Sequence, residues 1–234
     1  MKISLIIPMY NESSIVADTL KQVSEYMNRT FSDWEVLFSD DGSTDGCRKT
    51  VDEFPDERIR SVGYEVNQGK GAAVRNGMLN ASGDLMIFTD CDLAYGLDVL
   101  KTMVGYFEKN PTAGMVIGSR NLSDDGYEGY TFLRKVASKT YLKVLGIMAG
   151  FKLSDSQCGI KGFTKETVQA IFPSCEENRF AFDFEILLKA KNLGIQIVEM
   201  PVKVINHRES KVHLVRDSLR MMKALRQIKK RNKV

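Results

Sequence analysis

The chain has 234 residues, of which 43% are apolar and 27% charged, so it can bury the core of one large domain. This composition excludes disordered and fibrous proteins. The sequence contains no run of about 18 to 20 uncharged apolar residues, as a membrane-spanning helix needs, and residues 1–8 lack the small-residue cleavage site of a secretory signal. We therefore expect a cytoplasmic protein, soluble or peripheral to a membrane.

The net charge of +3 is unevenly distributed along the chain. Residues 201–234 contain 11 lysines and arginines against 2 acids, whereas residues 1–200 contain 22 against 28. A basic tail of this kind favours contact with an anionic surface. It is only a weak argument for nucleic acid, which we do not expect as a partner. The four cysteines are too widely spaced for a zinc site and too few for a disulfide scaffold, which favours a reducing compartment.

Strand-like and helix-like segments alternate through the first half of the chain. Branched and aromatic residues predict strands over 3–7, 34–39, 59–64, 85–89 and 115–119. The helical spacing of apolar residues predicts helices over 13–27, 72–81 and 97–107. This alternation is typical of the α/β class, with a mostly parallel sheet flanked by helices on both faces.

The alternation weakens after residue 120. We expect a loop over 121–130, helices over 132–148 and 181–192, and strands over 195–200 and 202–205 on either side of Pro201. From His213 onward, apolar residues recur at intervals of four and three with basic residues on the opposite side. This predicts one domain over 1–212 and a basic amphipathic helix over 213–234, which either lies on an anionic bilayer or docks its apolar stripe on the domain.

Polar clusters follow four of the predicted strands. Residues 8–12 follow the first strand, Asp40-Asp41-Gly42-Ser43 the second, Asp90-Cys91-Asp92 the fourth and Gly118-Ser119-Arg120 the fifth. Because the carboxyl ends of parallel strands share one edge of a sheet, we expect these clusters to converge there. The convergence predicts a functional site at that edge.

The pair Asp90 and Asp92 is the candidate metal site. Hard carboxylate oxygens suit Mg²⁺ or Mn²⁺, with diphosphate oxygens completing the coordination shell. Taken alone, the pattern is also that of a loop whose acids cap a helix. In the same way, the Gly-rich segment around Lys70 either offers backbone amides and an ammonium group to an anion or is an ordinary turn.

Arg120, Arg134 and Ser138 form a candidate anion pocket. Arg134 and Ser138 lie one turn apart on a predicted helix, and guanidinium groups bind phosphate bidentately. The turn that carries Asp155 concentrates small polar side chains before Gly159. Asp183 and Glu185 open a helix, where they serve either the site or the helix dipole.

In their order along the chain, these motifs resemble the inverting family 2 glycosyltransferases with the GT-A fold, over nearly the whole chain. The segments 155–163, 182–185 and 200–202 most resemble dolichyl-phosphate glucosyltransferases and polyprenyl-phosphate mannose or glucose synthases. The resemblance implies a Rossmann-like GT-A domain that uses Mg²⁺ or Mn²⁺. It also implies that a hexose passes, with inversion, from UDP-glucose, or less favourably GDP-mannose, to a polyprenyl phosphate on the cytosolic face of a membrane.

The resemblance also implies roles for individual residues. The nucleoside loop would contain Pro8, Tyr10 and Glu12, and Asp41 would contact the base. Asp90 and Asp92 would hold the cation, and Lys211 would lie near the diphosphate. The remaining matches place the lipid phosphate at Arg120, Arg134 and Ser138 and the reaction centre at Asp155.

One position departs from the pattern, and two other functions stay open. Ala94 stands where polyprenyl-phosphate mannose synthases often carry a Gln ligand, so water would fill that position. A hydroxyl-acceptor enzyme of surface-polysaccharide or teichoic-acid-like polymer synthesis would share the donor site and would need Asp155 or Asp183 as a general base. A non-catalytic nucleotide-sugar-binding subunit would bind the donor without turnover.

Overall fold

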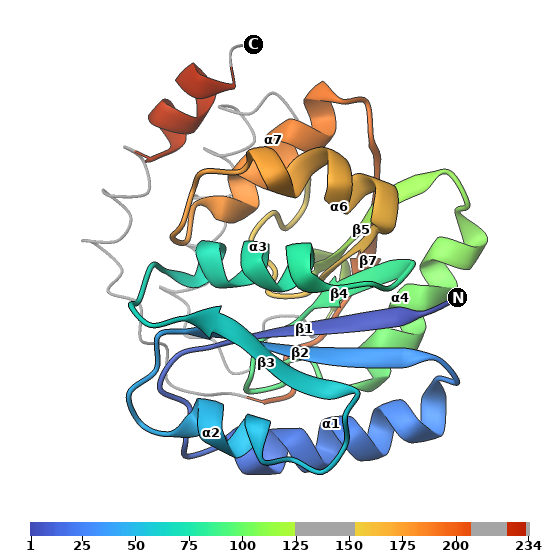
Figure 1. Cartoon of the computed structure of the whole chain (residues 1–234). Coiled ribbons are helices and arrows are strands. Elements are labelled where there is room, and N and C mark those ends of the chain that lie inside the picture. Colours follow the sequence, from blue (N-terminus) through green and yellow to red (C-terminus); the bar gives the residue numbers. More distant parts are fainter. Residues whose placement is uncertain (125–152, 207–223, 233–234) are drawn as a thin grey trace.

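A seven-stranded sheet forms the centre of the computed structural model, which describes residues 1–124, 153–206 and 224–232 (Figure 1). The strand order is β3-β2-β1-β4-β6-β5-β7. Strand β6 runs antiparallel to β4 and β5, and the other neighbours are parallel. The strands are β1 (Ile3–Met9), β2 (Trp34–Asp41), β3 (Ile59–Tyr64), β4 (Leu85–Phe88), β5 (Ala113–Ser119), β6 (Lys161–Thr164) and β7 (Gln196–Pro201).

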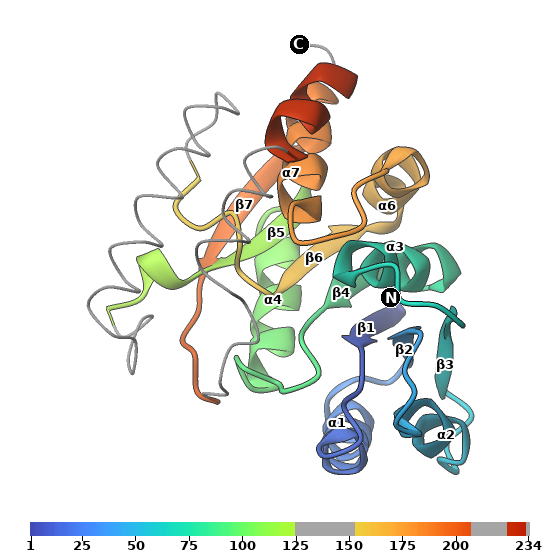
Figure 2. The same cartoon turned by 90° about the vertical axis from the view of Figure 1, so that its left-hand side faces the viewer.

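Helices cover both faces of the sheet (Figure 2). One face carries α1 (Val16–Thr30), α2 (Cys47–Asp52) and α4 (Asp98–Lys109). The other face carries α3 (Lys70–Asn80), α6 (Lys165–Ile171) and α7 (Phe182–Asn192). The short 3-10 turns η1 (Arg120–Leu122) and η2 (Phe172–Ser174) follow β5 and α6. This is the three-layer architecture expected from the alternation of strands and helices.

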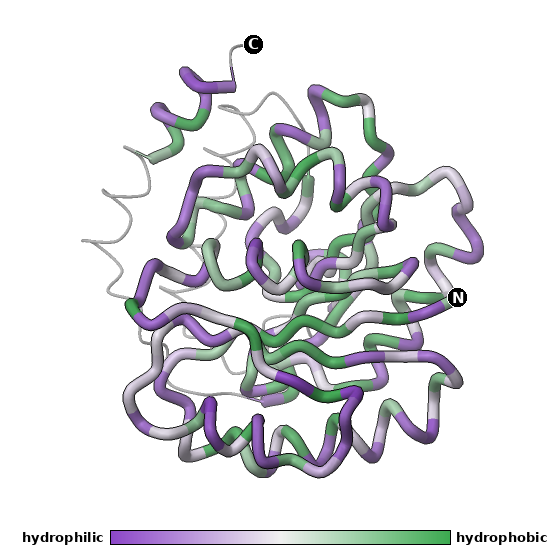
Figure 3. The backbone as a smooth tube through the Cα atoms, in the orientation of Figure 1, coloured by the Kyte–Doolittle hydropathy of each residue, from purple (hydrophilic) through white to green (hydrophobic). Residues whose placement is uncertain are grey.

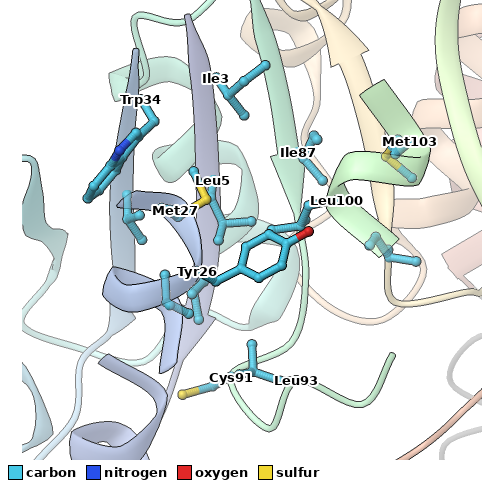
Figure 4. Close-up of a cluster of buried hydrophobic side chains, with 14 of the residues drawn as sticks. Ile3, Leu5, Tyr26, Met27, Trp34, Ile87, Cys91, Leu93, Leu100 and Met103 are labelled. Carbon is cyan, nitrogen blue, oxygen red and sulfur yellow. The ribbon is translucent and has the colours of Figure 1, made fainter. Parts of the chain in front are cut away.

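The central strands are mostly apolar because helices bury them from both sides. Every residue of β1 is buried, and the hydropathy colouring is hydrophobic through the middle of the sheet (Figure 3). Figure 4 shows one of the two cores, where Tyr26 and Met27 of α1 pack beside Leu5 of β1 and Leu100 of α4. The core holds the strand ends, and therefore the loops beyond them, in fixed positions.

Over the residues that the structure describes, the predicted order of strands and helices is confirmed, with differences at the ends and one wrong strand. Residues 202–205 do not form a strand. Pro201 ends β7 because proline has no amide to donate to a neighbouring strand. The Val202 amide still donates to the Ser119 carbonyl (3.1 Å), and the chain then crosses to Ala94, whose carbonyl accepts from the Ile205 amide (2.8 Å). The sequence patterns also missed α2, β6 and α6.

The described end of the chain is a helix over 224–231 that lies beside α7 (Figures 1 and 2). Leu225 and Ile228 are fully buried, and Arg231 forms an ion pair with Glu176 (2.8 Å). In this described part of the chain, Leu225 and Ile228 therefore pack on the domain. The predicted helix over 132–148 and the start of the one over 213–234 lie outside the described residues. Within the described ranges, no helix has the length and apolar character to span a bilayer.

Candidate functional site

The predicted site residues that the structure describes gather at one edge of the sheet. Strands β1, β2 and β4 are parallel, so the loops that follow them leave the sheet at the same edge. Strand β6 is antiparallel and pairs its first residue, Lys161, with Phe88 at the end of β4. The turn before β6 therefore reaches the same edge from the opposite chain direction.

The loops after β1 and β2 are tied together by hydrogen bonds. The Asn11 amide donates to the Ser43 hydroxyl (2.9 Å), and Asn11 Oδ1 accepts from the Thr44 amide (2.9 Å). The Ser13 amide donates to Asp45 Oδ2 (2.8 Å). Asn11 has a left-handed backbone (φ 52°), a conformation that asparagine tolerates better than most residues. These contacts fix the segment that contains Pro8, Tyr10 and Glu12.

Asp41, at the end of β2, holds the Gly-rich turn before α3. Its carboxylate is buried and accepts from the Gln68 amide (2.8 Å), the Gly69 amide (2.9 Å) and Asn67 Nδ2 (2.8 Å). Burial raises the pKa of Asp41, although these hydrogen bonds act in the opposite direction. Asp41, which is predicted to contact the nucleoside, therefore also anchors the turn that leads to Lys70.

Lys70 and Asp90 form an ion pair across the site. Lys70 is the first residue of α3, and its ammonium contacts Asp90 Oδ1 beyond the end of β4. Burial acts to lower the pKa of Lys70, but the negative charge of Asp90 raises it. The sequence predicted both residues as site members, and the structure brings them together.

Asp92 lies partly buried beside the negative charge of Asp90. Burial, followed by repulsion from Asp90, raises the pKa of Asp92, while its Oδ1 accepts from the Ala94 amide (3.1 Å). A cation between two such carboxylates would relieve their repulsion. Within the described residues, no group of three His, Cys, Asp or Glu side chains is placed to hold a metal. The assignment of Asp90 and Asp92 to a metal therefore stays a prediction.

Two contacts shape this acidic turn. Leu93 has a left-handed backbone (φ 50°), and Asn206 Nδ2 donates to the carbonyls of Asp92 (3.3 Å) and Leu93 (3.1 Å). Gly159 lies so close that a Cβ there would come within 2.4 Å of Asp90 Oδ2. Sequence patterns contain no signal for Asn206, because its contacts depend on where the chain crosses after β7.

Arg120 and Asp155, predicted as separate site residues, form one ion pair. Arg120 Nε lies 2.6 Å from Asp155 Oδ2, and Arg120 Nη2 lies 2.9 Å from Oδ1. Asp155 is fully buried, and its charge raises the pKa of Arg120 although burial opposes this. Such two-pronged pairs fix the guanidinium plane. Arg134, Ser138 and Lys211 lie outside the described residues.

Lys161 is a buried site residue to which the sequence interpretation assigned no role. It has no exposed surface, and its Nζ donates to Asp183 Oδ1 (2.6 Å) and to the Cys158 carbonyl (2.6 Å). Burial raises the pKa of Asp183, and the charge of Lys161 opposes this. The signal available was a lysine inside the short apolar run 160–163, which calls for a buried acid.

The chain is similar to known glycosyltransferases. Residues 4–172 match the family model described as glycosyl transferase family 2. A dolichyl-phosphate beta-glucosyltransferase from Dictyostelium discoideum is 32% identical, over 97% of this chain and 73% of that protein. Dolichyl-phosphate beta-glucosyltransferase ALG5C from Trichomonas vaginalis is 30% identical, over 90% of this chain and 66% of its own length.

The fold is shared with a solved enzyme structure. Glucosyl-3-phosphoglycerate synthase from Mycobacterium tuberculosis, in complex with Mn²⁺, UDP and phosphoglyceric acid, matches with a TM-score of 0.73 at 18% identity. The match covers all of this chain and 79% of that one. Together with the carboxylates, lysine and arginine at the sheet edge, these likenesses identify the class of enzyme. The chain belongs to glycosyl transferase family 2 and is a glycosyltransferase with a GT-A-like fold.

Proposed function

We propose that this chain transfers glucose from UDP-glucose to a polyprenyl phosphate, with inversion at the anomeric carbon. The relatives named dolichyl-phosphate beta-glucosyltransferase support this acceptor class, because their similarity extends over nearly the whole chain. The assignment of a nucleotide-sugar donor rests on the acidic turn of Asp90 and Asp92, which Lys70 faces. Opposite charges at a strand end suit a nucleoside diphosphate and its cation.

In this proposal, the nucleoside lies at the ends of β1 and β2. Pro8, Tyr10 and Glu12 line its pocket together with Asp41. The hydrogen bonds between the loops after these strands support this placement, because a pre-formed pocket loses little entropy when it binds. Tyr10 is exposed, so its ring is open to contact with a ligand.

Asp90 and Asp92 would hold Mg²⁺ or Mn²⁺. The fit rests on the raised pKa of Asp92 and on the closeness of two like charges. A divalent cation supplies charge stabilisation to the departing diphosphate. Lys70, already paired with Asp90, adds a second positive charge at the same place. We place Lys211 near the diphosphate as well.

The acceptor phosphate would bind at Arg120, Arg134 and Ser138. Asp155 supports this assignment because it fixes the plane of the Arg120 guanidinium. A phosphate monoester has a second pKa of about 6 and is mostly ionised near neutral pH, so it needs no general base. A hydroxyl acceptor would need one, and Asp183, with its raised pKa, is the acid better suited to that task.

The test is a donor and acceptor panel with purified protein. It combines UDP-glucose, GDP-mannose and UDP-galactose with Mg²⁺ or Mn²⁺ and a short polyprenyl phosphate, followed by mass analysis. We expect glucosyl phosphoryl polyprenol, formed only with metal. Transfer to hydroxyl acceptors alone would support the polymer-synthesis alternative, and metal-dependent UDP binding without turnover would support a binding subunit.

A matched variant separates the two substrates. Arg134→Ala should weaken the use of polyprenyl phosphate more than the binding of UDP, and an equal loss of both would contradict the acceptor pocket. Contact of the basic residues in 213–234 with an anionic membrane is part of the same proposal. Flotation with vesicles that contain phosphatidylserine, compared with neutral vesicles, tests that contact.

A further inference from the structure

We propose that Glu185 is a positioning residue for the donor. It acts through the backbone of residues 176–178, which sets the position of Lys70. The inference deepens the proposed function, on which it rests for the assignment of Lys70 to the donor diphosphate. From the sequence, Glu185 was predicted to serve either the site or the dipole of its helix, without a named contact.

Glu185 is an acid that binds a neighbouring loop. It lies in the first turn of α7 and is 2% exposed. Its Oε2 accepts from the amides of Glu176 (3.0 Å) and Glu177 (2.7 Å). Two amide donors on one carboxylate oxygen form strong hydrogen bonds that hold the loop in one conformation.

The segment held by Glu185 packs directly on the Gly-rich turn before α3. The Asn178 carbonyl accepts from the Ala72 amide (3.2 Å). A Cβ on Gly69 would lie 2.4 Å from the Asn178 carbonyl oxygen, and one on Gly71 would lie 2.6 Å from that of Glu177. The two backbones are therefore in contact on both sides of Lys70, and a shift of one displaces the other.

A second clamp acts on the same segment from the side of α3. Arg75 Nη1 donates to the Cys175 carbonyl (2.8 Å), and Nη2 donates to Asn178 Oδ1 (2.8 Å). Helix α3 begins at Lys70, whose ammonium contacts Asp90. The loop thus joins α7 to α3, and Glu185 holds one end of the connection that orients Lys70 toward the acidic turn.

The functional test measures binding without turnover. Calorimetry with Mn²⁺ and UDP is compared for the wild type, Glu185→Ala, Glu185→Gln and Arg75→Met, with Glu166→Ala as a control for an exposed acid on α6. We expect about a tenfold weaker affinity in Glu185→Ala and Arg75→Met, about threefold in Glu185→Gln, which keeps an acceptor oxygen, and less than about twofold in the control.

A double variant tests whether the effect passes through Lys70. In the Lys70→Met background, Glu185→Ala should add less than about a twofold loss, because non-additivity is the sign of a shared pathway. Multiplicative losses would overturn the inference. If Glu185→Ala does not fold, Glu185→Gln and Arg75→Met carry the comparison.

A second measurement does not depend on any ligand. Hydrogen exchange of peptides that cover residues 67–73 should speed up in Glu185→Ala and not in Glu166→Ala. Unchanged exchange there overturns the inference whatever the substrate is. If the wild type binds neither UDP nor GDP with metal, the proposed donor is wrong, and the exchange result alone decides the role of Glu185.

Discussion

The ammonium of Lys161 lies 2.6 Å from Oδ1 of Asp183 in the protein interior, where the lysine has no exposed surface. Taking one charge away leaves the other buried without compensation. Lys161→Met should therefore lower the free energy of unfolding by about 3 to 5 kcal/mol, and the double variant with Asp183→Asn should recover much of this loss. Urea denaturation at pH 7.5 measures both values. If Lys161→Met were as stable as the wild type, the result would contradict a stabilising ion pair between Lys161 and Asp183.

Gly159 provides a test of the geometry around Asp90. In Gly159→Ala, the new methyl group would lie 2.4 Å from Asp90 Oδ2 and must displace that carboxylate. Because small misplacements at a reaction centre are costly, we expect about a 100-fold loss of turnover. The matched control is Gly105→Ala, inside α4, where a Cβ meets nothing within 4 Å. That control should keep full activity and gain up to about 1 kcal/mol of stability.

Asp92 is expected to serve function at a cost in stability. Burial and repulsion from Asp90 raise its pKa, so its removal relieves an unfavourable interaction in the folded protein. Asp92→Ala should leave the melting temperature unchanged or higher while metal-dependent turnover falls by about 10³-fold. The two readouts are initial rates over a Mn²⁺ titration and thermal unfolding. Full activity would remove the cation from the mechanism.

Asp45 gives a pH dependence with a defined sign. Burial acts to raise its pKa, but hydrogen bonds, including those from the Ser13 and Cys47 amides, lower it to about 2. A lowered folded-state pKa means that the ionised form stabilises the fold above the usual pKa of aspartate, near 3.9, and that this stability is lost as the pH falls toward 2. Asp45→Asn should melt below the wild type at pH 6, and the gap should close near pH 2. A difference in melting temperature that does not change with pH would show that the ionised Asp45 carboxylate is not its cause.

Most strands of the sheet could be predicted from the sequence, because strands buried on both faces appear as mostly apolar runs. Strand β6 escaped detection for the opposite reason. It is four residues long, contains Lys161 and Gly162, and makes physical sense only beside Asp183, 22 positions further along the chain. Local patterns contain no information on such a partner.

The candidate site, too, could be predicted from the sequence only in part. Asp90, Asp92 and Lys70 were predicted from residue types at strand and helix ends, and they meet in the structure. The contacts that orient them come from Asn206 and from the backbone at Gly159, which reach the acidic turn through tertiary packing. Their positions follow from the crossing of the chain after Pro201 and from the direction of β6.

That reversed direction has a consequence for reading other sequences of this architecture. After a parallel strand, the predicted site residues follow the apolar run, whereas those beside β6 precede the strand, at Asp155 and the residues after it. A search confined to the residues after each strand would miss half of the arginine–aspartate pair described above. In related chains, a polar turn that leads into a short strand with a solitary lysine is therefore the place to look for the buried acid that pairs with such an arginine.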